Sequence, residues 1–156
     1  MGVPLYYDDL EPGQVFTLPA RTVTETDLVN FAMLSGDWNP IHTDQEFTKG
    51  TIYGRPVVYG LFSVVMMTGL LDRSGLFSGS AMAMLDITDW RFEKPVFVGD
   101  TLHATVEIAG KRLTSGGDRG IVDRLFRIIN QRGEVVQSGH IGLLIRCGPQ
   151  SAENVS

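Results

Sequence analysis

Hydrophobic and polar positions divide the chain into a helical first half and a strand-rich second half. The first helical stripe has the i, i+3, i+4, i+7 spacing of one buried helix face and consists of Leu28, Phe31, Ala32 and Ser35. Thr24 precedes this stripe as an N-cap, and Asp27 follows three residues later, where it favours the helix dipole. Gly36 lies where C-terminal glycines end helices. The pattern therefore predicts a helix between Thr24 and Gly36.

The segments on either side of this helix give weaker signals. Residues 15–23 are rich in aromatic and β-branched side chains, which predicts an extended segment. A second, shorter helix is predicted to start at Thr43, because Thr43 and Glu46 have the spacing of a capping box. Pro40 lies between the two helices, where it removes a backbone donor and moves Asn39 out of the α region. We therefore expect a tight turn at Pro40.

Residues 56–71 form the most apolar segment of the chain, with hydrophobic side chains on nearly every face of the predicted helix. A helix that is apolar all round is either buried or in a membrane. This segment is shorter than the roughly 20 residues needed to cross a bilayer, and Ser63, Thr68 and Gly69 interrupt it. We predict a buried core helix that begins at Pro56.

Strand patterns dominate the second half. Apolar and polar side chains alternate along residues 101–108, and residues 83–91, 121–129 and 134–146 are also β-rich. Turn residues connect the last three strands as hairpins. Early helices and consecutive late strands predict an α+β fold with an antiparallel sheet. A curved sheet wrapped around one long apolar central helix is the hot-dog architecture. We predict one such domain over residues 1–147 and a frayed polar tail over residues 148–156.

Composition and charge narrow the function classes. The chain has 156 residues and a formal net charge of -5, which argues against a nucleic-acid or anionic-membrane partner. Cys147 is the single cysteine, so no internal disulfide and no cysteine-based zinc site is expected. The absence of disulfides, and of a signal-peptide pattern in the first residues, predicts a cytoplasmic location.

The turn between the first two helices carries the candidate chemistry. Asp37 and His42 lie at either end of a segment stiffened by Pro40, so a carboxylate and an imidazole could act as an acid/base pair. The alternative is structural, with Asp37 capping backbone donors and His42 packing at the turn. A metal site built on His42 with the nearby Asp44 and Asp37 is less favoured, because no further strong ligand follows at helical spacing.

Three blocks of the sequence resemble one protein family. Residues 31–44, FAMLSGDWNPIHTD, resemble the signature of the MaoC-like dehydratases, the (R)-specific enoyl-CoA hydratases of hot-dog fold. Residues 92–102, FEKPVFVGDTL, resemble the start of a strand in that family. Residues 54–60, GRPVVYG, lie where the family begins its central helix. The resemblance extends from about Tyr7 to Arg146, and its first block is the most specific.

The resemblance implies roles for six residues. Asp37 and His42 match the catalytic pair, which would hold one water between them. Asn39 matches a residue that supports the turn and the substrate site. Gly60 matches the glycine whose N–H points at the thioester carbonyl, although simple helix packing would also explain a glycine there. Two further positions are assigned to substrate binding: Tyr59 and Thr68.

Tyr59 and Thr68 are the less certain members of this set. The family commonly has histidine before the glycine, and here the residue is Tyr59, which can donate a hydrogen bond but does not titrate near neutral pH. Thr68 lies where the family often has a hydroxyl near the substrate carbonyl. Its alternative role is a hydrogen bond back to its own helix.

The resemblance implies reversible addition of water to a trans-2-enoyl thioester, with no metal or redox cofactor. Coenzyme A would enter only as part of the acyl-CoA substrate. We expect a homodimer or a larger homo-oligomer, because the sheet would leave an open edge. Two alternatives are a hot-dog acyl-CoA thioesterase and a non-catalytic acyl-CoA-binding subunit.

Overall fold

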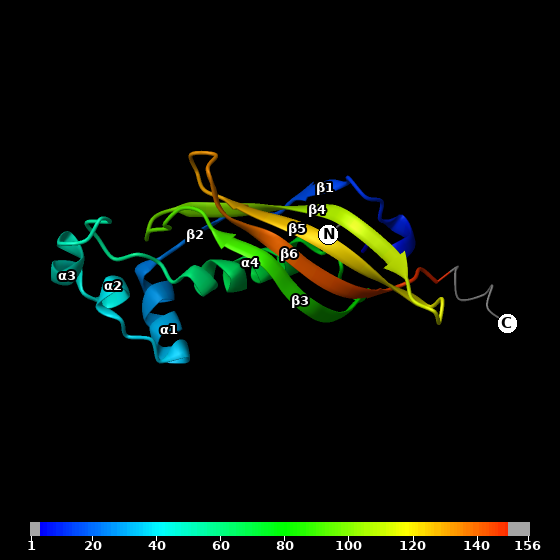
Figure 1. Ribbon diagram of the computed structural model, residues 1–156, viewed down its shortest axis with the longest axis horizontal. Coiled ribbons are helices and arrows are strands. Elements are labelled where there is room, and N and C mark those ends of the chain that lie inside the picture. The colour runs from blue at the N-terminus through cyan, green and yellow to red at the C-terminus, as the bar shows by residue number, and fades with distance from the viewer. Residues whose placement is uncertain (1–3, 150–156) are drawn as a thin grey trace.

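A computed structural model describes residues 4–149 of the chain (Figure 1). The elements in chain order are η1 (Tyr7–Asp9), β1 (Val15–Thr17), β2 (Arg21–Thr22), α1 (Glu25–Ser35), α2 (Pro40–Thr43), α3 (Gln45–Lys49), α4 (Gly60–Ser74), β3 (Ala81–Phe92), β4 (Thr101–Leu113), β5 (Arg119–Ile129) and β6 (Val135–Arg146). Helices α1, α2 and α3 gather at one end of the molecule, beside the start of α4 (Figure 1).

The strands form an antiparallel sheet in the order β1-β4-β5-β6-β3, and β2 also pairs with β4. The four long strands include the four β-rich runs of the sequence, apart from Glu134, which precedes β6. The alternation along β4 places Leu102, Ala104, Val106 and Ile108 in the interior. The predicted α+β class with an antiparallel sheet is confirmed.

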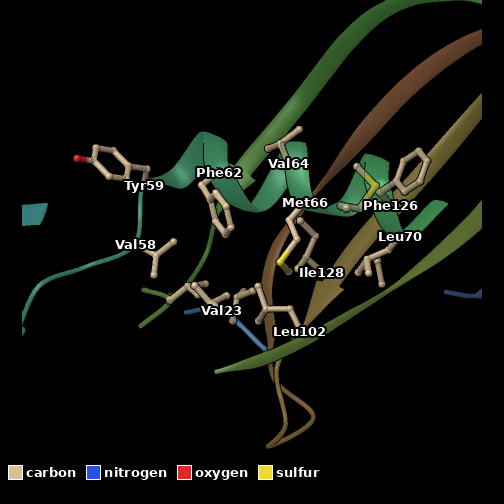
Figure 2. Packing of buried hydrophobic residues seen from close by; sticks show 14 of the residues in the cluster. Val23, Val58, Tyr59, Phe62, Val64, Met66, Leu70, Leu102, Phe126 and Ile128 are labelled. Atoms are coloured by element: carbon tan, nitrogen blue, oxygen red, sulfur yellow. The ribbon is translucent and has the colours of Figure 1, made fainter. Parts of the chain in front are cut away.

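Helix α4 lies along one face of the curved sheet (Figures 1 and 2). Phe62, Met66 and Leu70 from α4 belong to one buried cluster with Phe126 and Ile128 from β5. Full burial of one such side chain is worth about 1.5–3 kcal/mol, so this contact is the main source of cohesion between helix and sheet.

Helix α4 begins later than the apolar pattern predicts. The expected start at Pro56 is wrong, because the helix begins at Gly60 and has Tyr59 as its N-cap. Val57 and Val58 are extended, since their N–H groups donate to the carbonyls of Ile41 and Val96 at 3.1 and 2.8 Å. These long-range bonds compete with helical ones and hold the segment straight as it reaches α4.

One face of α4 is also more exposed than predicted. Leu61 and Val65 are 63% and 55% exposed, so the helix is not buried on every side. A single sheet covers only one face of the helix, which leaves the opposite face open. Within residues 4–149, strand β3 pairs with β6 alone, and its exposed large apolar side chains are Met82, Met84, Leu85, Ile87 and Phe92.

The caps of α1 are the ones that the sequence predicts, whereas the caps of α2 and α3 are not. Thr24 and Asp27 form the expected capping box, and Gly36 ends α1 in the left-handed region with φ 73°. Residues Pro40–Thr43 form a short helix where the sequence predicts a turn. The predicted cap at Thr43 is wrong, because the Asp44 carboxylate accepts from Phe47 N at 2.9 Å and caps α3.

The described part of the chain ends within the predicted tail. Gly148 N donates to the Asp8 carboxylate at 2.6 Å, so the start of this tail is tied to η1 and its neighbours. The rest of the predicted tail, residues 150–156, lies outside the described residues. Within residues 4–149, no helix has the length and hydropathy needed to cross a membrane.

Candidate active site

Short-range hydrogen bonds shape the turn that carries Asp37 and His42. The Asp37 carboxylate accepts from Asn39 N at 3.1 Å, and the Asn39 side chain accepts from Ile41 N at 3.1 Å. Asn39 is therefore the N-cap of α2, where Pro40 occupies the first helical position. The expected supporting role of Asn39 in the turn agrees with this geometry.

His42 is oriented by a backbone carbonyl. Its Nδ1 atom lies 2.6 Å from Val57 O. A carbonyl oxygen can only accept, so Nδ1 carries the hydrogen and donates it. In the neutral imidazole this leaves Nε2 with a lone pair, which is the form that can take up a proton. The extended segment before α4 thus selects the tautomer of His42.

Tyr59 connects the two members of the predicted pair. The side chain is 4% exposed, and its hydroxyl donates to the main-chain O of Asp37 at 2.7 Å. Its ring lies against the His42 ring, with centroids 3.9 Å apart and an angle of 30° between the planes. Burial, followed by the nearby charge of Asp37, raises the pKa of Tyr59 above its usual range. The phenol therefore stays protonated at neutral pH and keeps donating to Asp37.

His42 borders two hollows on the protein surface. One hollow of about 380 Å³ also has Gly60, Phe92 and Gln137 in its wall. The other has a volume of about 290 Å³ and is mostly apolar, with Leu28, Ala32, Trp38, Pro56 and Val98 in its wall. The first hollow thus brings the imidazole and the predicted backbone donor to one cavity.

Gly60 lies at a helix start that is closely packed. As the first residue of α4, it has no helical partner for its N–H, and the positive end of the helix dipole lies there. A Cβ atom added to Gly60 would lie 2.7 Å from the ring of Phe92. Gly60 O accepts from Gln137 Nε2 at 3.0 Å. Both the expected donor role and the alternative packing role therefore have a geometric basis.

Thr68 lies away from the other predicted residues. Its hydroxyl donates to Val65 O at 2.6 Å, which is the bond to its own helix that the sequence leaves open. It borders a separate hollow together with Leu71, Asp72 and Phe77. Within one chain, the structure groups Asp37, Asn39, His42, Tyr59 and Gly60 and leaves Thr68 apart.

Two residues beside Gly60 are absent from the six site residues predicted from the sequence. Gln137 and Phe92 both contact Gly60, from β6 and β3. Gln137 is 2% exposed, and it follows two valines in a strand whose other buried members are apolar or glycine. A glutamine among buried apolar positions is the sequence feature that could have pointed to this residue, because buried amides need hydrogen-bond partners. Among residues 4–149, no group of three or more His, Cys, Asp or Glu side chains is arranged to hold a metal ion.

Comparison with known proteins identifies the family. Residues 9–124 match the model of the MaoC like domain, which is more than half of the chain. The chain therefore belongs to the MaoC-like dehydratase family. A protein from Mycobacterium tuberculosis that is described as having a double hotdog fold covers 94% of this chain, with a TM-score of 0.78 at 21% identity. This likeness concerns the fold, and it confirms the predicted hot-dog architecture.

Individual relatives agree with this assignment. Protein MaoC of Klebsiella aerogenes is 37% identical over 109 residues, which are 70% of this chain and 31% of that protein. The chain thus spans about a third of that relative. An (R)-specific enoyl-CoA hydratase from Aeromonas caviae is 34% identical over 130 residues, which are 83% of this chain and 91% of the relative.

A solved structure is also closely similar. The monoamine oxidase regulatory protein from Archaeoglobus fulgius superposes with a TM-score of 0.86 at 37% identity, covering 94% of this chain and 97% of that one. Two of the sequence relatives carry names of hydro-lyases: the (R)-specific enoyl-CoA hydratase from Aeromonas caviae and a 3-hydroxybutyryl-CoA dehydratase from Methylorubrum extorquens. These names agree with the enzyme class predicted from the sequence.

Proposed function

We propose that this protein is an (R)-specific enoyl-CoA hydratase, which adds water reversibly to a trans-2-enoyl thioester. One observation carries the proposal. Tyr59 binds the main-chain O of Asp37 and stacks on the His42 ring, so it keeps the two residues close together, and the next residue is Gly60, whose N–H lacks a helical partner. A carboxylate, an imidazole and an oxyanion donor are the three groups that conjugate addition of water requires.

In the proposed reaction, Asp37 and His42 hold a water at the β-carbon of the substrate. One of the pair accepts a proton from the water as its oxygen bonds to this carbon. The other enters this step protonated and delivers its proton to the α-carbon on the same face, and exchange with solvent then returns both groups to their starting protonation states. Negative charge collects on the thioester oxygen between these events. Gly60 N–H donates to that oxygen, and such a donor contributes about 2.7–4 kcal/mol in a dry site. The reaction needs no metal or redox cofactor.

Two observations bear on the alternative functions. A thioesterase of this fold would use a carboxylate on the central helix, and the one carboxylate in α4, Asp72, lies near the helix end in the separate hollow beside Thr68, away from His42 and Gly60. A non-catalytic acyl-CoA-binding subunit would not need His42 held in one tautomer by Val57 O. The hydratase is therefore the better interpretation of the site, with an acyl-CoA as substrate and the cytoplasm as the proposed location.

The exposed surfaces support a homodimer. Strand β3 is an open sheet edge with apolar side chains, and the uncovered face of α4 carries Leu61 and Val65. An unpaired apolar edge favours association with a second copy. Light scattering at micromolar concentration should give at least twice the 17.1 kDa chain mass. A mass of one chain would contradict this assembly.

The test of the proposed function is an absorbance assay for loss of the enoyl thioester chromophore. Crotonyl-CoA and longer trans-2-enoyl-CoA substrates should each lose absorbance, and the product should have the R configuration. Free thiol is measured in the same samples. Release of thiol without hydration would favour the thioesterase, and binding without either product would favour the non-catalytic subunit.

A further inference from the structure

Gln137 joins three elements of the fold through one buried side chain. It is 2% exposed and lies in β6. Its Oε1 atom accepts from the indole N–H of Trp90 in β3 at 3.1 Å, and its Nε2 atom donates to Gly60 O in α4 at 3.0 Å. The amide therefore links two strands of the sheet to the first residue of the central helix.

The chemistry of the two partners requires a side chain that both accepts and donates a hydrogen bond. The Trp90 indole can only donate, and the Gly60 carbonyl can only accept. A side chain that satisfies both must accept at one end and donate at the other, as a primary amide does. Trp90 also sets the direction of the amide, since a flipped Gln137 would present NH₂ to the indole N–H.

The position of Gly60 depends on these contacts. Glycine has wide backbone freedom, and the first residue of a helix is held by few helical hydrogen bonds. Here its carbonyl is bound by Gln137, and the ring of Phe92 occupies the space of the missing Cβ. An oxyanion donor acts only when it lies about 2.7–3.1 Å from the developing charge. The aim of Gly60 N–H is therefore controlled from β3 and β6.

We propose that Gln137 is a positioning residue for the hydration reaction, with Trp90 fixing the orientation of its amide. Gln137 acts through Gly60 and does not touch the reacting atoms. This inference rests on the proposed function, because it assigns a purpose to the donor that the reaction uses.

The first test replaces Gln137 with methionine, which is similar in length and has no N–H. Q137M should lower kcat about 10-fold and change KM less than about 2-fold, because the donor acts mainly in the transition state. W90F, which removes the orienting N–H together with part of the indole ring, should show the same pattern with a smaller loss. Q131M is the matched control, since Gln131 also makes two hydrogen bonds, to Asp100 and Thr101, away from Gly60. It should leave kcat unchanged.

The second test uses pH to switch the hydrogen bond. In Q137E, a protonated carboxyl can accept from Trp90 and donate to Gly60 O, whereas the ionised carboxylate can only accept. Burial raises the pKa of a carboxyl, which moves this switch toward neutral pH. The ratio of Q137E to wild-type kcat should therefore be near one at low pH and fall as pH rises. A purely structural role predicts no such pH dependence in the kcat ratio.

The outcomes separate this inference from the proposed function. A folded Q137M with normal kcat overturns the positioning role, whether or not its melting temperature falls. If Q137M does not fold, the Q137E ratio and W90F decide, and a flat ratio with normal W90F kcat overturns it as well. A wild-type protein that hydrates no enoyl thioester overturns both proposals. The backbone order parameter of Gly60 N–H, expected to fall in Q137M and not in Q131M, tests the hold on Gly60 without any activity.

Discussion

The turn at Asp37–His42 and the start of α4 at Gly60 are held by different kinds of contact. In the turn, the carboxylate of Asp37 and the side chain of Asn39 bind N–H groups two residues further along the chain. Gly60 is held by Gln137, which is 77 residues away, and by Phe92. The acid/base half of the site is thus built mainly from neighbours in sequence, and the oxyanion half from distant strands.

Tyr59 lies between these two halves. Its hydroxyl bond reaches back to Asp37, and the peptide that follows it carries the Gly60 N–H. The comparison teaches that a short motif can specify the reactive side chains, whereas a backbone donor needs the assembled sheet. Variants in each half should therefore differ in how far their effects depend on distant residues.

The largest expected effect is in the turn. D37N and H42A should each lower turnover at least ~10²-fold, because positioned proton transfer is worth ~10²–10⁴-fold. Both folds should survive, as both residues lie near the surface of a short turn. Turnover with crotonyl-CoA and thermal unfolding are measured together.

The controls are D123N and H140A. Asp123 and His140 form a carboxylate–imidazole contact at 2.9 Å, on the sheet. These variants should keep normal turnover. Near-normal turnover in D37N or H42A would show that the replaced residue takes no part in proton transfer.

The second effect concerns Gly60. G60V should lower kcat/KM roughly 10²-fold, the order lost with one oxyanion donor, because valine keeps the N–H but its branched side chain lies where the thioester carbonyl must approach. Its new side chain would also collide with Phe92, so F92A provides the background in which this collision is absent. F92A alone removes one of the two contacts that hold Gly60 and should lower kcat/KM much less than G60V, because Gln137 still binds Gly60 O, and G60V/F92A should still show the large loss.

The paired measurements are kcat/KM and the thermal midpoint. Recovery of activity in G60V/F92A would mean that Gly60 serves only the packing of Phe92. In that case Gly60 N–H would not act as an oxyanion donor.

A smaller effect is expected at Tyr59, which lies between the turn and Gly60. Y59F removes the hydrogen bond to Asp37 O and keeps the ring on His42. Turnover should fall about 10-fold, and stability by about 1 kcal/mol, the usual worth of such a bond. The raised pKa of Tyr59 keeps its phenol protonated, so the ratio of wild-type to Y59F turnover should stay constant between about pH 6 and 9. A ratio that changes over this range would show that Tyr59 itself titrates in the reaction.

The smallest effect is expected at Ser63, one turn after Gly60. Its Oγ atom is buried, and no residue of the described chain hydrogen-bonds it. S63A should therefore change the free energy of unfolding by less than about 1 kcal/mol, or stabilise the protein, since an unpaired hydroxyl costs free energy when buried. Urea unfolding checks this. A large destabilisation would show that Ser63 has a partner in solution, such as a water.

The sequence by itself determined the local features. The structure contains the capping box of Thr24 and Asp27, the helix end at Gly36 and the alternating burial along β4. Each of these features follows from contacts within a few residues. The turn with Asp37 and His42 was equally visible, because Pro40 and Asn39 shape it without help from distant strands. These features depend on short-range sterics and hydrogen bonds.

Only the tertiary structure decided where α4 begins and what surrounds it. Apolar character favours a helix from Pro56 onward, but Ile41 and Val96 draw the preceding segment into an extended form, and the helix starts at Gly60. The roles of Gln137 and Phe92 likewise depend on how β6 and β3 meet the helix. Such contacts form between residues far apart in the chain, and no local pattern records which distant partner each residue will find.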